Sequence, residues 1–311
     1  MKLKLLAFTL ILCLILSACG NVAGVSVPAQ NTETAVKTAE EGAASGSAVD
    51  YPAKPDDTTG DAVTGASTAT EGAITSERAL AAEPAAEPEP IWYEPAPVKS
   101  EGTPTGIVYL TFDDGPCGYT DDVLAVLDKY GVKATFFLTA SHPSMFRYIK
   151  DIADAGHGIG VHSYTHEYYQ CYASEEAFYE ECEKMNDVIE EYTGYRTNIL
   201  RFPGGSSNTV SAKYVKGLMT ALAAGVEERG YTYFDWNVSS GDASSNTSVN
   251  SIISNTEKGI KKNRESVVLM HDFKKNTLQA LPHIIEWCLE NGYELRPLTA
   301  DGPTCHQKIN N

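Results

Sequence analysis

The fold is decided by a stretch of ten residues, IVYLTFDDGP, at positions 107–116. Its first six residues are aromatic, aliphatic or β-branched, which is the composition of a buried strand. The stretch then changes at once to two adjacent carboxylates, Asp113 and Asp114, followed by Gly-Pro. A plain turn would account for Asp-Gly-Pro, but it does not explain why two carboxylates stand side by side where a strand ends.

Six further short apolar runs follow along the chain, with helical spacing between them. The predicted strands are 107–112, 134–139, 158–162, 199–202, 231–238, 266–270 and 293–298. The predicted helices are 121–129, 143–155, 175–192, 212–229, 249–262 and 278–290. This alternation predicts parallel βαβ units and an α/β fold, for which a parallel barrel and an open doubly wound sheet both fit. No glycine-rich phosphate loop occurs, so nucleotide binding has no support.

Polar side chains gather at the carboxyl ends of these strands, where α/β barrels build their active sites. After Asp113 and Asp114 come the motifs HSYTH at 162–166, RFPGG at 201–205 and LMHD at 269–272. Histidines, carboxylates and an arginine at successive strand ends are expected to converge on one cavity.

His162 and His166 have a spacing that can direct two imidazoles at one metal ion. The spacing alone is weak evidence, because a metal site also needs a third ligand. Asp114 can supply it from a neighbouring strand end. Two imidazoles and one carboxylate leave a coordination position open for water, as in catalytic zinc sites.

The motifs TFDDGP, HSYTH, RFPGG and LMHD resemble, in order and approximate spacing, those of the NodB-homology polysaccharide deacetylases, carbohydrate esterase family four. The resemblance covers roughly residues 104–300. It implies a distorted (β/α)7-type barrel that removes N-acetyl groups from glycans. It also implies a divalent metal, Zn²⁺ in our interpretation, with Co²⁺ or another divalent ion as alternatives.

The resemblance also implies a role for each matching position. Asp114, His162 and His166 resemble the metal ligands. Asp113 resembles the general base that activates the water, and Arg201 resembles the residue that pairs with this base. A guanidinium beside a carboxylate favours its charged form, although Arg201 could also be a purely structural partner.

The leaving amine needs a proton donor, and His271 resembles the general acid that supplies it. Asp242 resembles the carboxylate that orients this histidine and stabilises its charged form. By position, Gly204 is the backbone N–H donor to the oxyanion. We expect Trp236 and Leu269 on the substrate side, Trp236 as a sugar-stacking wall or, equally well, as a buried barrel aromatic.

Two positions depart from the family pattern. Gly204 stands where many members have an aromatic residue, and Ala243 stands where many have a tryptophan. Both changes remove surface that would line a substrate groove, so they affect substrate preference rather than the metal or proton-transfer residues. Cys117, three residues after Asp114, is a candidate competitor for the metal.

The N-terminus predicts an export signal over residues 1–18. Lys2 and Lys4 precede an apolar run that is too short to span a bilayer, which needs about 20 residues. The sequence LSACG at 16–20 then resembles a bacterial lipobox, with cleavage before Cys19 and lipidation of its thiol. The alternative is an ordinary signal peptide with a coincidental cysteine.

Residues 19–103 predict a disordered acidic tether rich in Ala, Thr, Glu and Pro, because they lack the apolar groups that offset ordering entropy. Its one aromatic island, 91–93, is expected to pack on the edge of the next domain. The formal net charge of the chain is −17. That charge argues against a nucleic-acid partner, which needs clustered Lys and Arg.

We therefore expect a catalytic domain at 104–300 and a C-terminal tail at 301–311. The predicted enzyme is a metal-dependent hydrolase that removes N-acetyl groups from a cell-wall glycan, with peptidoglycan N-acetylglucosamine as the preferred substrate. The alternatives are a chitin-oligosaccharide or acetylxylan deacetylase and, in another class, an inactive glycan-binding surface lipoprotein. We expect a monomer on the outer face of the cytoplasmic membrane that touches the membrane only through its lipid, or else a secreted protein.

Overall fold

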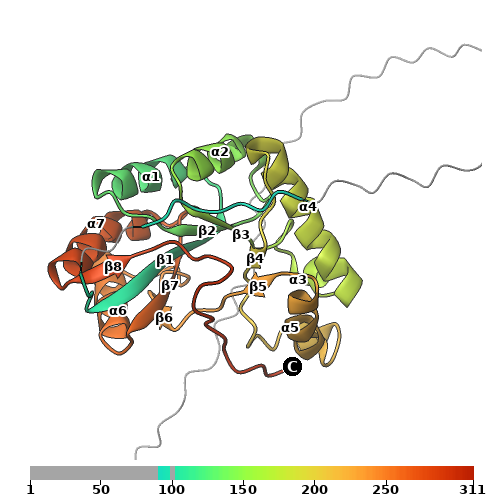
Figure 1. The fold of residues 1–311 in the computed structure, drawn as a ribbon. Helices are drawn as coiled ribbons and strands as arrows, with labels where there is room; N and C mark the ends of the chain where they lie inside the picture. Colours follow the sequence, from blue (N-terminus) through green and yellow to red (C-terminus); the bar gives the residue numbers. More distant parts are fainter. Residues whose placement is uncertain (1–89, 99–101) are drawn as a thin grey trace, which may run out of the picture. The chain divides into compact units, whose positions relative to one another are not determined.

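The computed structural model describes residues 90–98 and 102–311 (Figure 1). The predicted signal peptide, Cys19 and nearly all of the predicted tether lie outside the described residues. Among the residues that the structure describes, no helix is both long and apolar enough to cross a membrane.

The fold is organised around a central strand, β1 (Gly106–Gly115). The other strands are β2 (Thr135–Leu138), β3 (Gly158–Val161), β4 (Ile199–Leu200), β5 (Thr232–Tyr233), β6 (Val238–Ser239), β7 (Glu265–His271) and β8 (Tyr293–Leu295). Their order in the sheet is β5-β4-β3-β2-β1-β7-β6, and β8 pairs with the beginning of β1. Each of these pairings is parallel, which confirms the predicted α/β class.

The prediction of one strand at 231–238 is wrong. This stretch forms two short strands, β5 and β6, which stand at opposite ends of the strand order. Arg201 explains the interruption, because its guanidinium donates hydrogen bonds to the carbonyls of Phe234 (2.9 Å) and Asp235 (3.0 Å). The Asp235 N–H donates to the Cys305 carbonyl. The carbonyls of Phe234 and Asp235 and the N–H of Asp235 are therefore not paired with a neighbouring strand. The sheet therefore curls into a barrel that β5 and β6 do not close.

The helices lie outside the curled sheet (Figure 1). They are α1 (Thr120–Lys129), α2 (Arg147–Asp154), α3 (Tyr168–Cys171), α4 (Glu175–Thr193), α5 (Leu218–Glu228), α6 (Val249–Ile260) and α7 (Lys275–Glu290). Short 3₁₀ turns, at Pro143–Met145 and Ser211–Lys213, replace the first turns of the helices predicted at 143–155 and 212–229.

Gly217 explains why the second of those helices begins late. Its φ of 78° is left-handed, and a left-handed residue cannot continue a right-handed helix. The short helix α3 is not predicted from the sequence, because one turn is too short to show a helical period.

The two faces of β1 have different neighbours. Leu110 and Phe112 belong to the large apolar cluster that the sheet shares with the helices. Tyr109 belongs to a smaller cluster on the other face of the strand. Because side chains alternate along a strand, Thr111 and Asp113 share the face of Tyr109. The interior of the barrel is thus apolar at the start of β1 and polar at its end, where the site lies.

The predicted aromatic island at 91–93 packs on the edge of the domain, as expected. Trp92 forms a parallel bridge with Arg196. The Tyr93 hydroxyl donates to the carbonyl of His157 at 2.6 Å.

The residues set apart as a C-terminal tail also pack against the domain. The Gln307 N–H donates to Asp235 Oδ2 at 2.7 Å. The His306 ring stacks on Tyr233, with centroids 3.8 Å apart. This tail lies beside β5 and the interrupted stretch after it, at the edge where the barrel stays open.

Candidate active site

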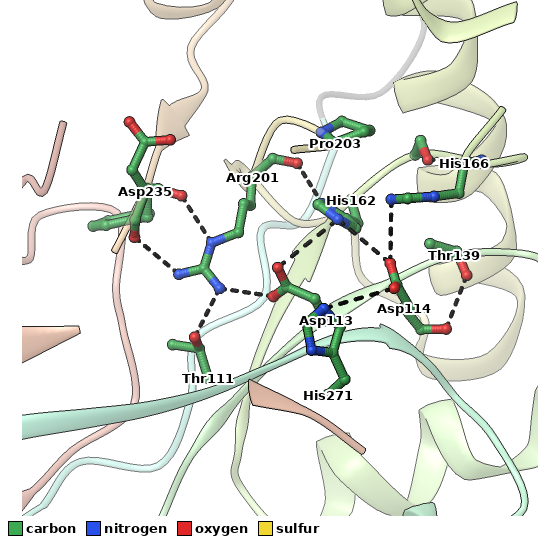
Figure 2. A network of polar contacts seen from close by, with 12 residues as sticks. Thr111, Asp113, Asp114, Thr139, His162, His166, Arg201, Pro203, Asp235 and His271 are labelled. Carbon is green, nitrogen blue, oxygen red and sulfur yellow. Dashed lines mark hydrogen bonds and ion pairs between the residues drawn. The ribbon is translucent and has the colours of Figure 1, made fainter. Parts of the chain in front are cut away.

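The site begins at the carboxyl end of β1, where Asp113 and Asp114 point toward the same histidine. The pairing register of β1 with β2 shifts between Asp113 and Gly115, and Asp114 has a left-handed φ of 71°. A bulge of this kind changes the direction of the following side chain. As a result, both carboxylates face His162 rather than opposite sides of the sheet (Figure 2).

Asp114, His162 and His166 form a group whose ligand atoms all lie within 4.8 Å of one another. Asp114 Oδ1 is 3.5 Å from His162 Nε2 and 3.3 Å from His166 Nε2. The two histidines lie across a bend from strand to loop, because β3 ends at Val161 and His166 has a left-handed φ of 59°.

The chemistry of this group fits a divalent metal. His162 Nδ1 lies 2.7 Å from the Arg201 carbonyl, which can only accept, so Nδ1 carries the hydrogen and Nε2 keeps its lone pair. Burial lowers the pKa of His162 to about 3, so the ring is neutral. Asp114 Oδ1 is buried and finds no hydrogen-bond partner among the described residues. Lone pairs that face one another in this way are the donor set of a cation site.

Arg201 holds Asp113 from the other side. The guanidinium is fully buried and donates to Asp113 Oδ1 and to Thr111 Oγ1, both at 2.7 Å. Its plane lies over the Phe137 ring, 4.2 Å from the centroid. Burial raises the pKa of the Asp113 carboxyl, and the charge of Arg201 opposes that rise. Asp113 is thus a buried carboxylate that is hydrogen-bonded to a cationic side chain, which suits a base.

His271 and Asp242 form a second pair on β7 and the loop after β6. His271 Nδ1 lies 2.9 Å from Asp242 Oδ1, and the His271 N–H donates to Asp242 Oδ2 at 2.7 Å. Burial alone would lower the pKa of His271, but the hydrogen bond and charge of Asp242 raise it to about 9. The imidazole is therefore cationic at neutral pH, with Nε2 directed at the site, 3.9 Å from Asp114 Oδ2.

The structure describes all three residues predicted on the substrate side. Gly204 has a φ of 75°, and its N–H donates no hydrogen bond to a described residue. Leu269 lies opposite Thr111 in the β1–β7 register, two residues before His271. Trp236 is half-buried, 5.8 Å from the Arg201 guanidinium by its ring centroid.

Cys117 is not a competitor for the metal. Its thiol accepts a hydrogen bond from the Tyr119 N–H at 3.3 Å and is not among the clustered ligand atoms. Burial raises the pKa of the thiol to about 11, so it is protonated at neutral pH. The five cysteines of the described residues are all free: Cys117, Cys171, Cys182, Cys288 and Cys305.

Two buried carboxyl groups that support the site were assigned no role from the sequence. Glu181 Oε2 accepts from the N–H and the hydroxyl of Thr165, at 2.7 and 2.8 Å, and so fixes the loop between the two histidines. Asp272 accepts from Thr120 at 2.5 Å behind the β1 turn, and burial raises its pKa to about 6. Asp272 directly follows His271 as the last residue of the LMHD motif, and this position could have identified it from the sequence. Glu181 lies among many acids of α4, and nothing in the sequence distinguishes it.

Comparison with known proteins places the chain among polysaccharide deacetylases. The sequence profile of the family named Polysaccharide deacetylase matches residues 100–221. The putative polysaccharide deacetylase YheN of Bacillus subtilis is 34% identical over 191 residues, which are 60% of this chain and 64% of YheN. A peptidoglycan-N-acetylglucosamine deacetylase of Bacillus cereus is 31% identical over 209 residues, 64% of this chain and 71% of that protein.

A solved structure gives the same result for the fold. The catalytic domain of a peptidoglycan N-acetylglucosamine deacetylase from Eubacterium rectale is 45% identical, with a TM-score of 0.66 over 74% of this chain and all of that one. The predicted distorted (β/α) barrel is thereby confirmed. From sequence, profile and fold together, the chain belongs to the NodB-homology polysaccharide deacetylases of carbohydrate esterase family four.

Proposed function

We propose that the chain is a metal-dependent hydrolase that removes N-acetyl groups from a cell-wall glycan, with peptidoglycan N-acetylglucosamine as its substrate. One observation carries the proposal: a buried carboxylate paired with arginine and a histidine paired with aspartate flank one three-donor metal group. Deacetylation of an amide needs a base for water and an acid for the amine, on either side of the attacked carbonyl. Named relatives from Bacillus cereus and Eubacterium rectale support the substrate.

Asp114, His162 and His166 would hold the metal. Two imidazoles and a carboxylate suit Zn²⁺, and Co²⁺ accepts the same donors. When bound, such an ion lowers the pKa of water and polarises a carbonyl oxygen.

The residues of the chain carry the proton transfers. Asp113 takes the proton of the attacking water, and Arg201 keeps this carboxylate oriented and charged. The Gly204 N–H donates to the carbonyl oxygen as negative charge develops on it. His271 Nε2 gives a proton to the leaving amine, and Asp242 stabilises the cationic ring before that transfer. The deacetylated sugar leaves with a free amine, and acetate is the second product.

The inactive glycan-binding alternative has less support than catalysis. A dead relative is expected to lack a ligand or a proton-transfer residue, and this chain retains all of them within contact distance.

We also propose that the mature chain is anchored through lipidated Cys19 on the outer face of the cytoplasmic membrane. The lipobox-like LSACG sequence and the length of the predicted tether support this placement. Labelling with a radioactive fatty acid tests it: the wild-type chain is expected to incorporate label and the Cys19→Ala chain none. Equal labelling of the two chains would contradict the anchor.

Acetate release from peptidoglycan, chitin oligomers and acetylxylan tests the proposed activity. We expect the zinc-loaded chain to act on peptidoglycan fastest. Asp113→Asn and His166→Ala should abolish release without loss of the fold, whereas His283→Ala, an exposed histidine on α7, should change nothing. Activity of Asp113→Asn near that of wild type would refute the mechanism, and a preference for acetylxylan would refute the substrate.

A further inference from the structure

We propose that Tyr168 is a further catalytic residue, whose hydroxyl donates a hydrogen bond to the acetamide carbonyl oxygen beside the N–H of Gly204. The inference rests on the proposed deacetylase function and assigns one more donor to the same site.

Tyr168 lies near both His166 and Gly204. It begins α3, two residues after His166, and the two ring centroids are 5.8 Å apart. A Cβ placed on Gly204 would lie 2.6 Å from Tyr168 Oη. The hydroxyl is therefore close to the backbone of Gly204, the proposed N–H donor, while its ring is beside a candidate metal ligand.

The position of the Tyr168 ring is fixed by its neighbours. It stacks on Tyr172, with centroids 5.7 Å apart and an angle of 23° between the ring planes. The buried Tyr172 hydroxyl donates to the Pro203 carbonyl at 2.7 Å. Pro203 directly precedes Gly204, so one contact orients both the Tyr168 ring and the loop that carries the N–H donor.

The Tyr168 hydroxyl has no hydrogen-bond partner in the part of the chain that the structure describes. Two nearby tyrosines differ: Tyr169 Oη accepts a hydrogen bond from Gln170 Nε2 at 3.0 Å, and the hydroxyl of Tyr172, directly after α3, donates to the Pro203 carbonyl. An ordinary phenol has a pKa of about 10, so Tyr168 Oη keeps its proton near neutral pH and can donate it. A positioned donor without a protein acceptor is suited to a ligand.

Glycine at position 204 leaves room for this hydroxyl. A side chain at 204 and Tyr168 Oη would occupy the same space, with a separation of 2.6 Å from the first carbon atom alone. The left-handed φ of 75° also makes any larger residue costly there. The glycine at position 204 therefore allows the Tyr168 hydroxyl to lie where it does.

The test is Tyr168→Phe in the full chain, which removes the hydroxyl and keeps the stacked ring. With N-acetylchitopentaose and one equivalent of zinc, we expect kcat to fall about 10- to 100-fold and KM to change less than about twofold, because the lost bond strengthens as charge develops. Zinc affinity and the unfolding temperature should equal those of wild type. Tyr169→Phe, which removes the neighbouring exposed hydroxyl, is the matched control and should match wild type in all four quantities.

The outcomes separate this inference from the function on which it rests. A wild-type chain that releases no acetate from any glycan refutes the function and the inference with it. An active wild type with an unchanged kcat in Tyr168→Phe refutes the inference alone. A loss confined to KM, or a loss that follows a loss of zinc affinity, also overturns it, since each would place the hydroxyl in ground-state binding or in metal support.

Discussion

Asp114 and His166 are the two residues other than glycine, within the described part of the chain, that have left-handed backbone angles. For such residues this conformation costs on the order of 1 kcal/mol. Both belong to the candidate metal-binding group of Asp114, His162 and His166, so strain is concentrated where the direction of a proposed ligand matters. The sequence showed which residues could bind a metal, but backbone angles follow from tertiary contacts and were not predictable from it.

This strain predicts a difference between two variants at one position. Without metal, His166→Gly should be more stable than His166→Ala, with a free energy of unfolding about 1 kcal/mol higher. The reason is that glycine adopts a φ of 59° without the steric clash of a Cβ. Urea denaturation of the two metal-free variants measures this difference. Equal stability of the two would show that residue 166 is not strained, and neither variant should release acetate.

The pairing of His271 with Asp242 predicts the pH dependence of activity. The acid must be protonated, so kcat/KM should fall as the pH rises through the pKa of His271, about 9. Asp242→Asn removes the charge that raises this pKa, so the fall should begin at a pH at least about one unit lower. A pH profile of acetate release from 6 to 10 measures the shift. Thr277→Ser, which keeps the hydroxyl that donates to Asp242 Oδ2, is the control, and an unmoved profile for Asp242→Asn would contradict the assignment.

At the scale of elements, α4 supports the loop that carries His166. Glu181 Oε2 accepts two hydrogen bonds from Thr165, which lies directly before His166. Glu181→Ala would leave the Thr165 N–H without its partner, at a cost of about 1–3 kcal/mol. We expect zinc affinity to fall about tenfold or more and the unfolding temperature to drop.

The neighbouring residue gives a matched control for that prediction. Glu180 is exposed on the same helix, and among the described residues it pairs with Lys184 alone, at 3.6 Å, so Glu180→Ala should leave zinc affinity unchanged. Isothermal titration with zinc compares the two variants. A folded Glu181→Ala chain that binds zinc as tightly as wild type would show that α4 does not position the ligand loop.

Elements with a local signal were predictable from the sequence, and elements shaped by distant residues were not. The apolar run before Asp113 is long enough to identify β1, and strand-end chemistry identified the histidines that follow β3. The stretch 231–238 has the composition of one strand. Arg201, some 30 residues earlier in the sequence, nevertheless donates hydrogen bonds to two of its carbonyls and so interrupts the strand. A contact of this kind leaves no trace in local periodicity.

At the scale of the whole molecule, we expect the residues before Glu89 to be dispensable for catalysis and the residues after Thr304 to contribute to stability. All of the proposed catalytic residues lie between Asp113 and His271. A chain that begins at Glu89 should therefore keep the kcat of the full chain on soluble oligosaccharides. A chain that ends at Thr304 loses the Gln307 bond to Asp235 and the His306 stack on Tyr233, so it should unfold at a temperature several degrees lower. Thermal unfolding and kcat of both truncations test this, and a large loss of kcat in the first would contradict it.

The most direct measurement is acetate released by the purified full chain as metal is removed and returned. We expect chelation to stop release from N-acetylglucosamine polymers and one equivalent of zinc to restore it. Asp113→Asn should bind the same one equivalent and stay inactive, because the proposed base and the proposed ligands are separate residues. Release that persists after chelation, or full activity of zinc-loaded Asp113→Asn, would contradict it.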